Sequence, residues 1–80
     1  MITYVVSIVF SNHAKDKLKT RKISLKIVSK AVYEFEKISP SFKGRKLRRK
    51  TVYGKMLEVV TVTEGSRITI ITAYYLEENL

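Results

Sequence analysis

The chain has 80 residues, 45% of them hydrophobic, which is enough for one small domain with a single core and too little for two. Lys and Arg number 16 against 7 Asp and Glu, giving a net charge of +9. The lack of cysteine excludes disulfides and cysteine-based zinc sites, and a single histidine excludes a histidine-rich metal site, so no metal or other cofactor is expected.

The first element is expected to be a strand over residues 3–10, where β-branched and aromatic side chains predominate. The apolar run at residues 1–10 is far shorter than the roughly 20 residues of a membrane span, and it has no basic leader. It therefore predicts a buried strand in a protein that does not enter a membrane, and we expect a cytoplasmic location.

A short helix should follow, begun by Ser11 or Asn12, whose side chains can accept hydrogen bonds from the free N–H groups of a first turn. Residues four apart are neighbours on a helix. One stripe of a helix over residues 13–21 therefore consists of His13, Lys17 and Arg21. The stripe places an imidazole, a side chain of the type that gains and loses protons near neutral pH, beside fixed positive charge. This combination suits phosphate chemistry. From the residues alone, the favoured interpretation is that this histidine only caps or packs the helix.

A second helix is expected over residues 25–37, with Ser24 as its cap. Its apolar positions recur at helical spacing: Ile27, Val28, Ala31, Val32 and Phe35. Ser39 and Pro40 should end this helix and begin a loop that runs to Gly44, because the residue before a proline is disfavoured in a helix.

The remaining sequence predicts three strands, over residues 46–53, 55–63 and 67–75, separated by turns that contain glycine. The strand over 55–63 is apolar on both faces and should be central, whereas the mixed pattern of 46–53 is typical of an edge. The predicted fold class is α+β in the order β-α-α-β-β-β, with a mainly antiparallel sheet and two helices packed on one face. Residues 1–80 should form a single domain.

One segment of the chain carries positive charge of a single sign. Residues 43–55 contain no acidic side chain and these basic ones: Lys43, Arg45, Lys46, Arg48, Arg49, Lys50 and Lys55. A cluster of one sign repels itself unless an anionic partner offsets it, which favours a functional interpretation over a merely solvated face. RNA or another nucleic acid would serve as that partner, and so would an acidic protein.

Several short motifs carry a family resemblance. Their order is His13-Ala14, then Arg21, Ile23-Ser24, Tyr53-Gly54-Lys55 and Ile70-Ile71-Thr72-Ala73-Tyr74. Together they resemble a family of small bacterial and archaeal domains of unknown function that looks related to the BrnT and RelE type toxins. The resemblance implies a RelE-like domain and a metal-independent ribonuclease of a toxin–antitoxin pair, with an acidic antitoxin-like protein as partner.

RNA scission without a metal needs a base for the 2′-hydroxyl, an acid for the leaving oxygen and cations for the developing phosphorane charge. The candidate catalytic residues are His13, Arg21 and Tyr74. The candidate nucleic-acid-binding residues are Lys17, Lys43, Arg45, Lys46, Arg48, Arg49, Lys50 and Arg67. Tyr74 and Tyr75 follow each other on one strand, so only one of them can face a given site.

The leading hypothesis is therefore a toxin-like RNA-binding protein that acts as a metal-independent endoribonuclease. Its alternative is a non-enzymatic basic module that binds nucleic acid or an acidic protein. A homodimer through an exposed sheet edge also stays open.

Overall fold

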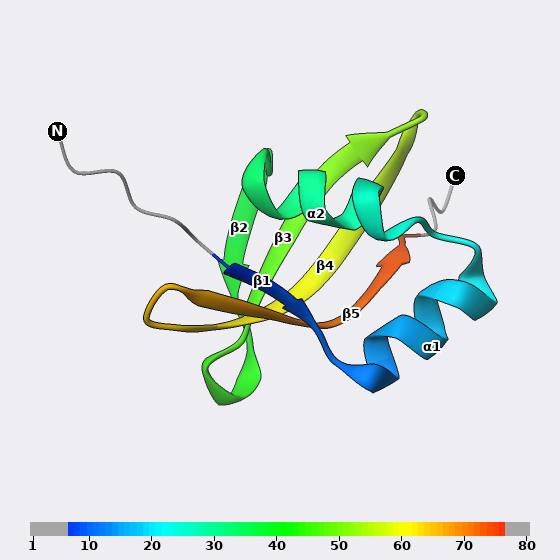
Figure 1. The fold of residues 1–80 in the computed structure, drawn as a ribbon. Coiled ribbons are helices and arrows are strands. Elements are labelled where there is room, and N and C mark those ends of the chain that lie inside the picture. The colour runs from blue at the N-terminus through cyan, green and yellow to red at the C-terminus, as the bar shows by residue number, and fades with distance from the viewer. Residues whose placement is uncertain (1–6, 77–80) are drawn as a thin grey trace, which may run out of the picture.

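A computed structural model describes residues 7–76 and shows an α+β fold in which two helices cover a mixed five-stranded sheet (Figure 1). The elements in chain order are β1 (Ser7–Phe10), α1 (Asn12–Arg21), α2 (Leu25–Tyr33), β2 (Lys37–Pro40), a short 3-10 turn (Phe42–Gly44), β3 (Lys46–Val52), β4 (Lys55–Glu64) and β5 (Arg67–Tyr75). The predicted class, both helices and the three C-terminal strands are confirmed. The strand expected over residues 3–10 is confirmed from residue 7, and its earlier part lies outside the described residues.

The strands lie in the order β1-β5-β4-β3-β2, so β4 is central, as its apolar sequence predicts. β1 pairs with β5 in parallel, and the other three pairings are antiparallel. The parallel pair requires a crossover, and α1, α2 and the three later strands supply it. The chain thus returns to place its last strand beside its first.

Serine caps fix where both helices begin. The hydroxyl of Ser11 accepts a hydrogen bond from the N–H of Ala14, and that of Ser24 accepts one from the N–H of Ile27, each at 3.0 Å. α1 ends where Lys22 adopts a left-handed conformation with φ of 58°. The two caps leave only a short connection between the helices, and α1 packs against β5 whereas α2 packs against β3 and β4.

The core lies on one face of the sheet. α1 contributes Ala14 and Leu18, and α2 contributes Val28, Ala31 and Val32, all of them at most 1% exposed. These side chains pack against buried strand residues that include Leu57, Val59, Ile68, Ile70 and Ala73. In Figure 1, α2 crosses in front of the sheet and α1 packs beside β5. The opposite face of the sheet carries no helix in the part of the chain that the structure describes.

The prediction of a helix over residues 25–37 is wrong at its C-terminal end. α2 stops at Tyr33, and residues 37–40, expected to be helix and loop, form the edge strand β2. The N–H of Glu36 donates to the carbonyl of Arg49 at 2.8 Å, which starts the pairing with β3. Phe35 stands at helical spacing, but strand pairing outweighs that local pattern, and Pro40 is tolerated because it ends an edge strand.

The expectation that residues 46–53 form an edge strand is also wrong. β2 is the edge strand on this side of the sheet, and β3 lies between β2 and β4. Two of its basic side chains are turned toward the helices. Arg48 Nη1 donates to the carbonyl of Val32 at 3.0 Å, and Lys50 Nζ donates to the carbonyl of Glu34 at 3.2 Å. The last carbonyls of a helix lack intrahelical partners and carry negative partial charge, so these cations hold the end of α2.

The two-residue turn that joins β3 to β4 places a bulky residue in a strained conformation. Tyr53 and Gly54 both have positive φ, of 51° and 79°, as a type I′ hairpin turn requires. Glycine adopts this conformation freely, whereas a bulky side chain is strained in it.

Replacing Tyr53 by Asn, which tolerates positive φ, should therefore raise the free energy of unfolding by about 0.5–1 kcal/mol. Urea unfolding followed by circular dichroism measures the change. Gly54→Ala is the opposing control and should destabilise the protein. A Tyr53→Asn variant no more stable than the parent would contradict the strain.

Candidate nucleic-acid interface

A bulge in β5 determines which side chains reach the uncovered face of the sheet. Thr61 pairs with Ile70 and Val60 pairs with Thr72, so Ile71 has no partner across the ladder. An unpaired residue of this kind shifts the alternation of side chains between the faces. After it, Ala73 is fully buried in the core, and Thr72 and Tyr74 lie on the uncovered face. Without the bulge Tyr74 would point toward the helices.

A row of polar side chains crosses the uncovered face at this level. Lys37 pairs with Arg49, Arg49 with Glu58 and Glu58 with Tyr74, each directly opposite the next. Arg21, from the end of α1, lies beside Tyr74 at the far end. We call this set the polar row: Lys37, Arg49, Glu58, Tyr74 and Arg21. It takes one side chain from each of β2, β3, β4, β5 and α1, and three of the five are cationic.

Glu58 is the centre of the polar row and is only 5% exposed. Its Oε1 accepts a hydrogen bond from Arg49 Nε at 2.7 Å, and its Oε2 accepts one from the hydroxyl of Tyr74. A carboxylate removed from water is costly unless it is paired and hydrogen-bonded, and both oxygens here are satisfied. The arrangement fixes the Arg49 and Tyr74 side chains in place.

Tyr74 is held in its protonated form by this environment. Burial, followed by the hydrogen bond to Glu58 and the negative charge of that carboxylate, raises the pKa of the Tyr74 hydroxyl to about 12. The phenol therefore keeps its proton well into the alkaline range, where an ordinary tyrosine ionises.

Arg21 is anchored by two hydrogen bonds from one terminal nitrogen. Its Nη1 donates to the hydroxyl of Thr72 and to the carbonyl of Ala73, both at 3.0 Å. Its guanidinium carbon lies 5.9 Å from the centroid of the Tyr74 ring, within cation–π range. Within residues 7–76 the second terminal nitrogen makes no hydrogen bond, so the group has a fixed position and free donors.

The residues predicted from the sequence separate into several groups. Arg21, Tyr74 and Arg49 come together in the polar row, and Tyr75 packs against the core, so Tyr74 is the tyrosine of this face. His13 and Lys17 are exposed on α1. Since a helix rises 1.5 Å per residue, His13 lies about 12 Å along the axis from Arg21. No hydrogen bond joins His13 to Arg21 or Tyr74 among the described side chains.

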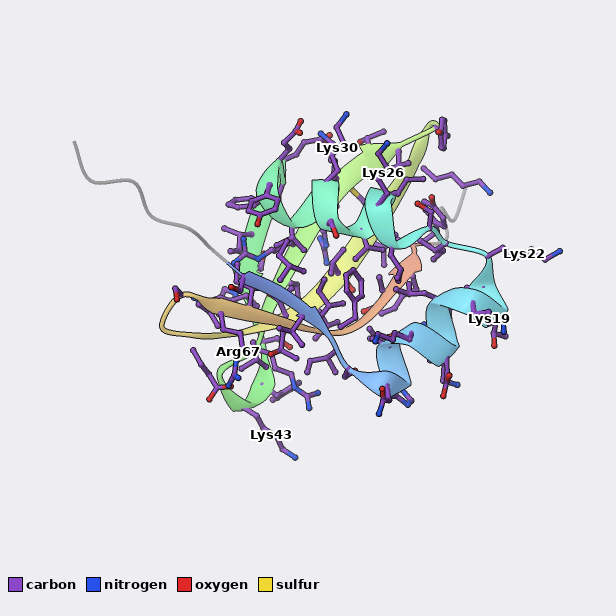
Figure 2. The ribbon with its side chains drawn as sticks, in the orientation of Figure 1. Lys19, Lys22, Lys26, Lys30, Lys43 and Arg67 are labelled. Atoms are coloured by element: carbon purple, nitrogen blue, oxygen red, sulfur yellow. The ribbon has the colours of Figure 1, made fainter. Side chains whose placement is uncertain are left out.

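The predicted basic residues outside the row lie elsewhere. Arg48 and Lys50 hold the end of α2 on the helix-covered side, and burial lowers the pKa of the Arg48 guanidinium. Lys43, Arg45, Lys46 and Arg67 lie at the end of the sheet where β2 turns into β3 and β4 into β5. Figure 2 shows Lys43 and Arg67 at this end of the molecule. The basic run of the sequence is thus divided among three surfaces.

Sequence reasoning missed Glu58 and Lys37. A signal for Glu58 existed, because it is the one charged residue in the apolar stretch from Met56 to Val62, where a charge has to be paired. Lys37 gave no such signal, since the strand that places it was not expected.

The row combines cations, a carboxylate and a neutral phenol on one open surface. Such a set binds phosphate through guanidinium groups and can stabilise charge that develops on it. No group of three or more His, Cys, Asp and Glu side chains that could hold a metal ion comes together among residues 7–76. No helix in the described ranges is long and apolar enough to cross a membrane.

Comparison with known proteins gives one family. A family model described as Domain of unknown function (DUF4258) matches residues 10–75, which include both helices and the polar row. No curated protein and no solved structure matches the chain significantly.

Removing the cation that pairs with Glu58 should destabilise the fold. Arg49→Met leaves a carboxylate that is 5% exposed without its ion pair, and we expect the free energy of unfolding to fall by about 2 kcal/mol. Urea unfolding measures the loss. Lys46→Met, on the same strand and outside any described ion pair, should change stability by no more than about 0.5 kcal/mol. Equal losses in the two variants would contradict the pairing.

The raised pKa of Tyr74 predicts how stability depends on alkaline pH. The unfolded phenol loses its proton near pH 10.0, whereas the folded one keeps it to about pH 12, so the unfolded state binds fewer protons between these values. The stabilisation is present below pH 10 and should be lost progressively as pH rises toward 12. A phenolate absorbance titration should show one of the five tyrosines ionising last, and Tyr74→Phe should abolish that step. Loss of a different step would refute the assignment.

Proposed function

We propose that this chain, which belongs to the family Domain of unknown function (DUF4258), binds RNA on the uncovered face of its sheet and cleaves it without a metal ion. The observation that carries the proposal is the anchoring of Arg21 beside Tyr74, in a row that also holds Glu58 and Arg49. Cations fixed in position before the substrate arrives lose little freedom on binding it, which is what electrostatic catalysis needs.

In this proposal the phosphodiester lies along the polar row. Arg21 and Arg49 bind its non-bridging oxygens and stabilise the added negative charge of the phosphorane. The 2′-hydroxyl loses its proton to a base, its oxygen bonds to phosphorus, and the bond from phosphorus to the 5′-oxygen breaks as that oxygen gains a proton. Tyr74 remains protonated and donates its one hydroxyl hydrogen to Glu58, which holds the phenol in place beside Arg21.

His13 is the proposed proton carrier. The imidazole is exposed near the start of α1, on the same helix as Arg21. Because the two are about 12 Å apart along the axis, the scissile phosphodiester lies between them in this proposal, with His13 at the reacting oxygens and Arg21 at a non-bridging oxygen. Lys17, between them on the helix, would bind the same phosphate.

The proposal extends to the relationship with the BrnT and RelE type toxins. The motifs at His13 and Arg21 that suggest this relationship are ones the catalytic role employs, whereas Tyr74 stands where the BrnT branch more often has an arginine. A toxin of this kind acts in the cytoplasm and is neutralised by an antitoxin, and the basic end of the sheet at Lys43, Arg45 and Lys46 would suit an acidic antitoxin.

One observation favours the non-enzymatic alternative. Both oxygens of the Glu58 carboxylate and the hydroxyl of Tyr74 are already engaged inside the fold. On this second interpretation the row is a fixed surface of cations that binds nucleic acid without cutting it.

End-labelled single-stranded and structured RNA incubated with the protein in chelator separates the two functions. An enzyme should cut the RNA, Arg21→Ala should slow cleavage by about 100-fold or more, and His13→Ala should do so with little change in binding. Lys19→Ala removes the same charge from an exposed position on α1 and should leave the rate unchanged (Figure 2).

Intact RNA that still binds, with an affinity that falls steeply with salt and falls again in Arg21→Ala, would establish the binding module. Failure of folded protein to bind or cut any RNA would refute both functions.

A further inference from the structure

A groove separate from the polar row lies between α2 and the end of β3. It has a volume of about 480 Å³ and is lined by Ser24, Lys26, Ile27, Lys30, Lys50, Thr51, Val52 and Tyr53. Pockets of about 300–1,000 Å³ are typical of small-molecule sites. The groove borders the helix-covered side of the sheet, so it is not part of the RNA surface proposed above.

The cations of the groove are arranged so that they repel one another. Lys26 and Lys30 are four residues apart on α2, a spacing at which like charges destabilise a helix. Figure 2 shows both side chains projecting from the same side of α2. Neither forms an ion pair within residues 7–76, and none of the residues that line the groove is acidic. The carboxylate of Glu36 lies next to the lining residue Thr51. It accepts hydrogen bonds from the N–H and the hydroxyl of Thr51, one on each oxygen.

Tyr53 gives the groove an aromatic wall. Its side chain is 88% exposed, and its φ of 51° is one that bulky residues avoid. The turn would be relaxed by Asn or Gly at this position, so an exposed aromatic ring is held there at the expense of stability. Strained residues of this kind occur where the side chain has a role beyond folding.

Cations and an exposed aromatic ring in one groove match the two parts of a nucleotide. Ammonium groups bind phosphate, aromatic rings stack on bases, and the side chains of Ile27 and Val52 provide apolar contact. We propose that this groove is a second ligand site, which binds a nucleoside phosphate with its base stacked on Tyr53 and its phosphate between Lys26 and Lys30. The nucleoside phosphate is either a free mononucleotide or one unit of a single-stranded RNA.

Chemical-shift titrations of the backbone amides test the site. The ligands are AMP, a 2′-O-methyl hexa-adenylate that the proposed cleavage cannot cut, and inorganic phosphate. AMP should shift amides of residues 24–30 and 50–54 in saturable fashion. Tyr53→Asn should weaken AMP binding about tenfold, Lys30→Ala should weaken it about threefold to tenfold, and Lys19→Ala should not change it.

The two sources of the ligand give different results. Binding of AMP and the hexamer with similar affinity identifies a mononucleotide site, and binding of the hexamer much more tightly, with the same dependence on Tyr53, identifies a unit of a strand. Because Tyr53→Asn is expected to stabilise the fold, its urea unfolding curve separates a lost contact from unfolding as the cause of weaker binding. Two results would overturn the proposal. One is that neither nucleotide gives saturable shifts. The other is that inorganic phosphate binds as tightly as AMP and that Tyr53→Asn does not affect its binding.

Discussion

A carboxylate removed from water in the middle of a sheet is the constraint around which the uncovered face is organised. Glu58 is 5% exposed, and an ion in such a place costs several kcal/mol unless partners replace its hydration. Arg49 supplies the charge and Tyr74 supplies the hydroxyl, each from the strand position directly opposite. The pairing of charge thus also fixes the register of the three strands that carry it.

The bulge at Ile71 makes that pairing geometrically feasible. β5 must bury Ile68 and Ile70 before it and Ala73 after it on the same face. Ile70 and Ala73 are three residues apart, an odd spacing that regular alternation would send to opposite faces, and one unpaired residue corrects it. The same correction turns Thr72 and Tyr74 to the uncovered face, where Arg21 bonds the hydroxyl of Thr72. Core packing and the position of the candidate site therefore depend on a single irregularity.

The sequence predicts those parts of the molecule that local rules determine. Ser11 and Ser24 begin helices at the expected places, and the apolar stretch of β4 lies at the centre of the sheet. The prediction is wrong at β2, because a four-residue strand forms through its pairing with β3 and not through its own sequence pattern. For the site, Arg21 and Tyr74 were found, but nothing in residue order shows that a bulge brings Tyr74 opposite Glu58.

The basic run around β3 shows why charge alone is an incomplete guide to function. A run of one sign needs an external anion only where its side chains share a surface. Alternation along β3 instead sends Arg48 and Lys50 to the carbonyls that end α2, and Arg49 to Glu58. Three of the run's cations are thus offset within the fold, by a helix end and by a carboxylate. Among the described residues, the positive charge without such contacts includes Lys26 and Lys30, Lys43, Arg45 and Lys46, and the free donors of Arg21.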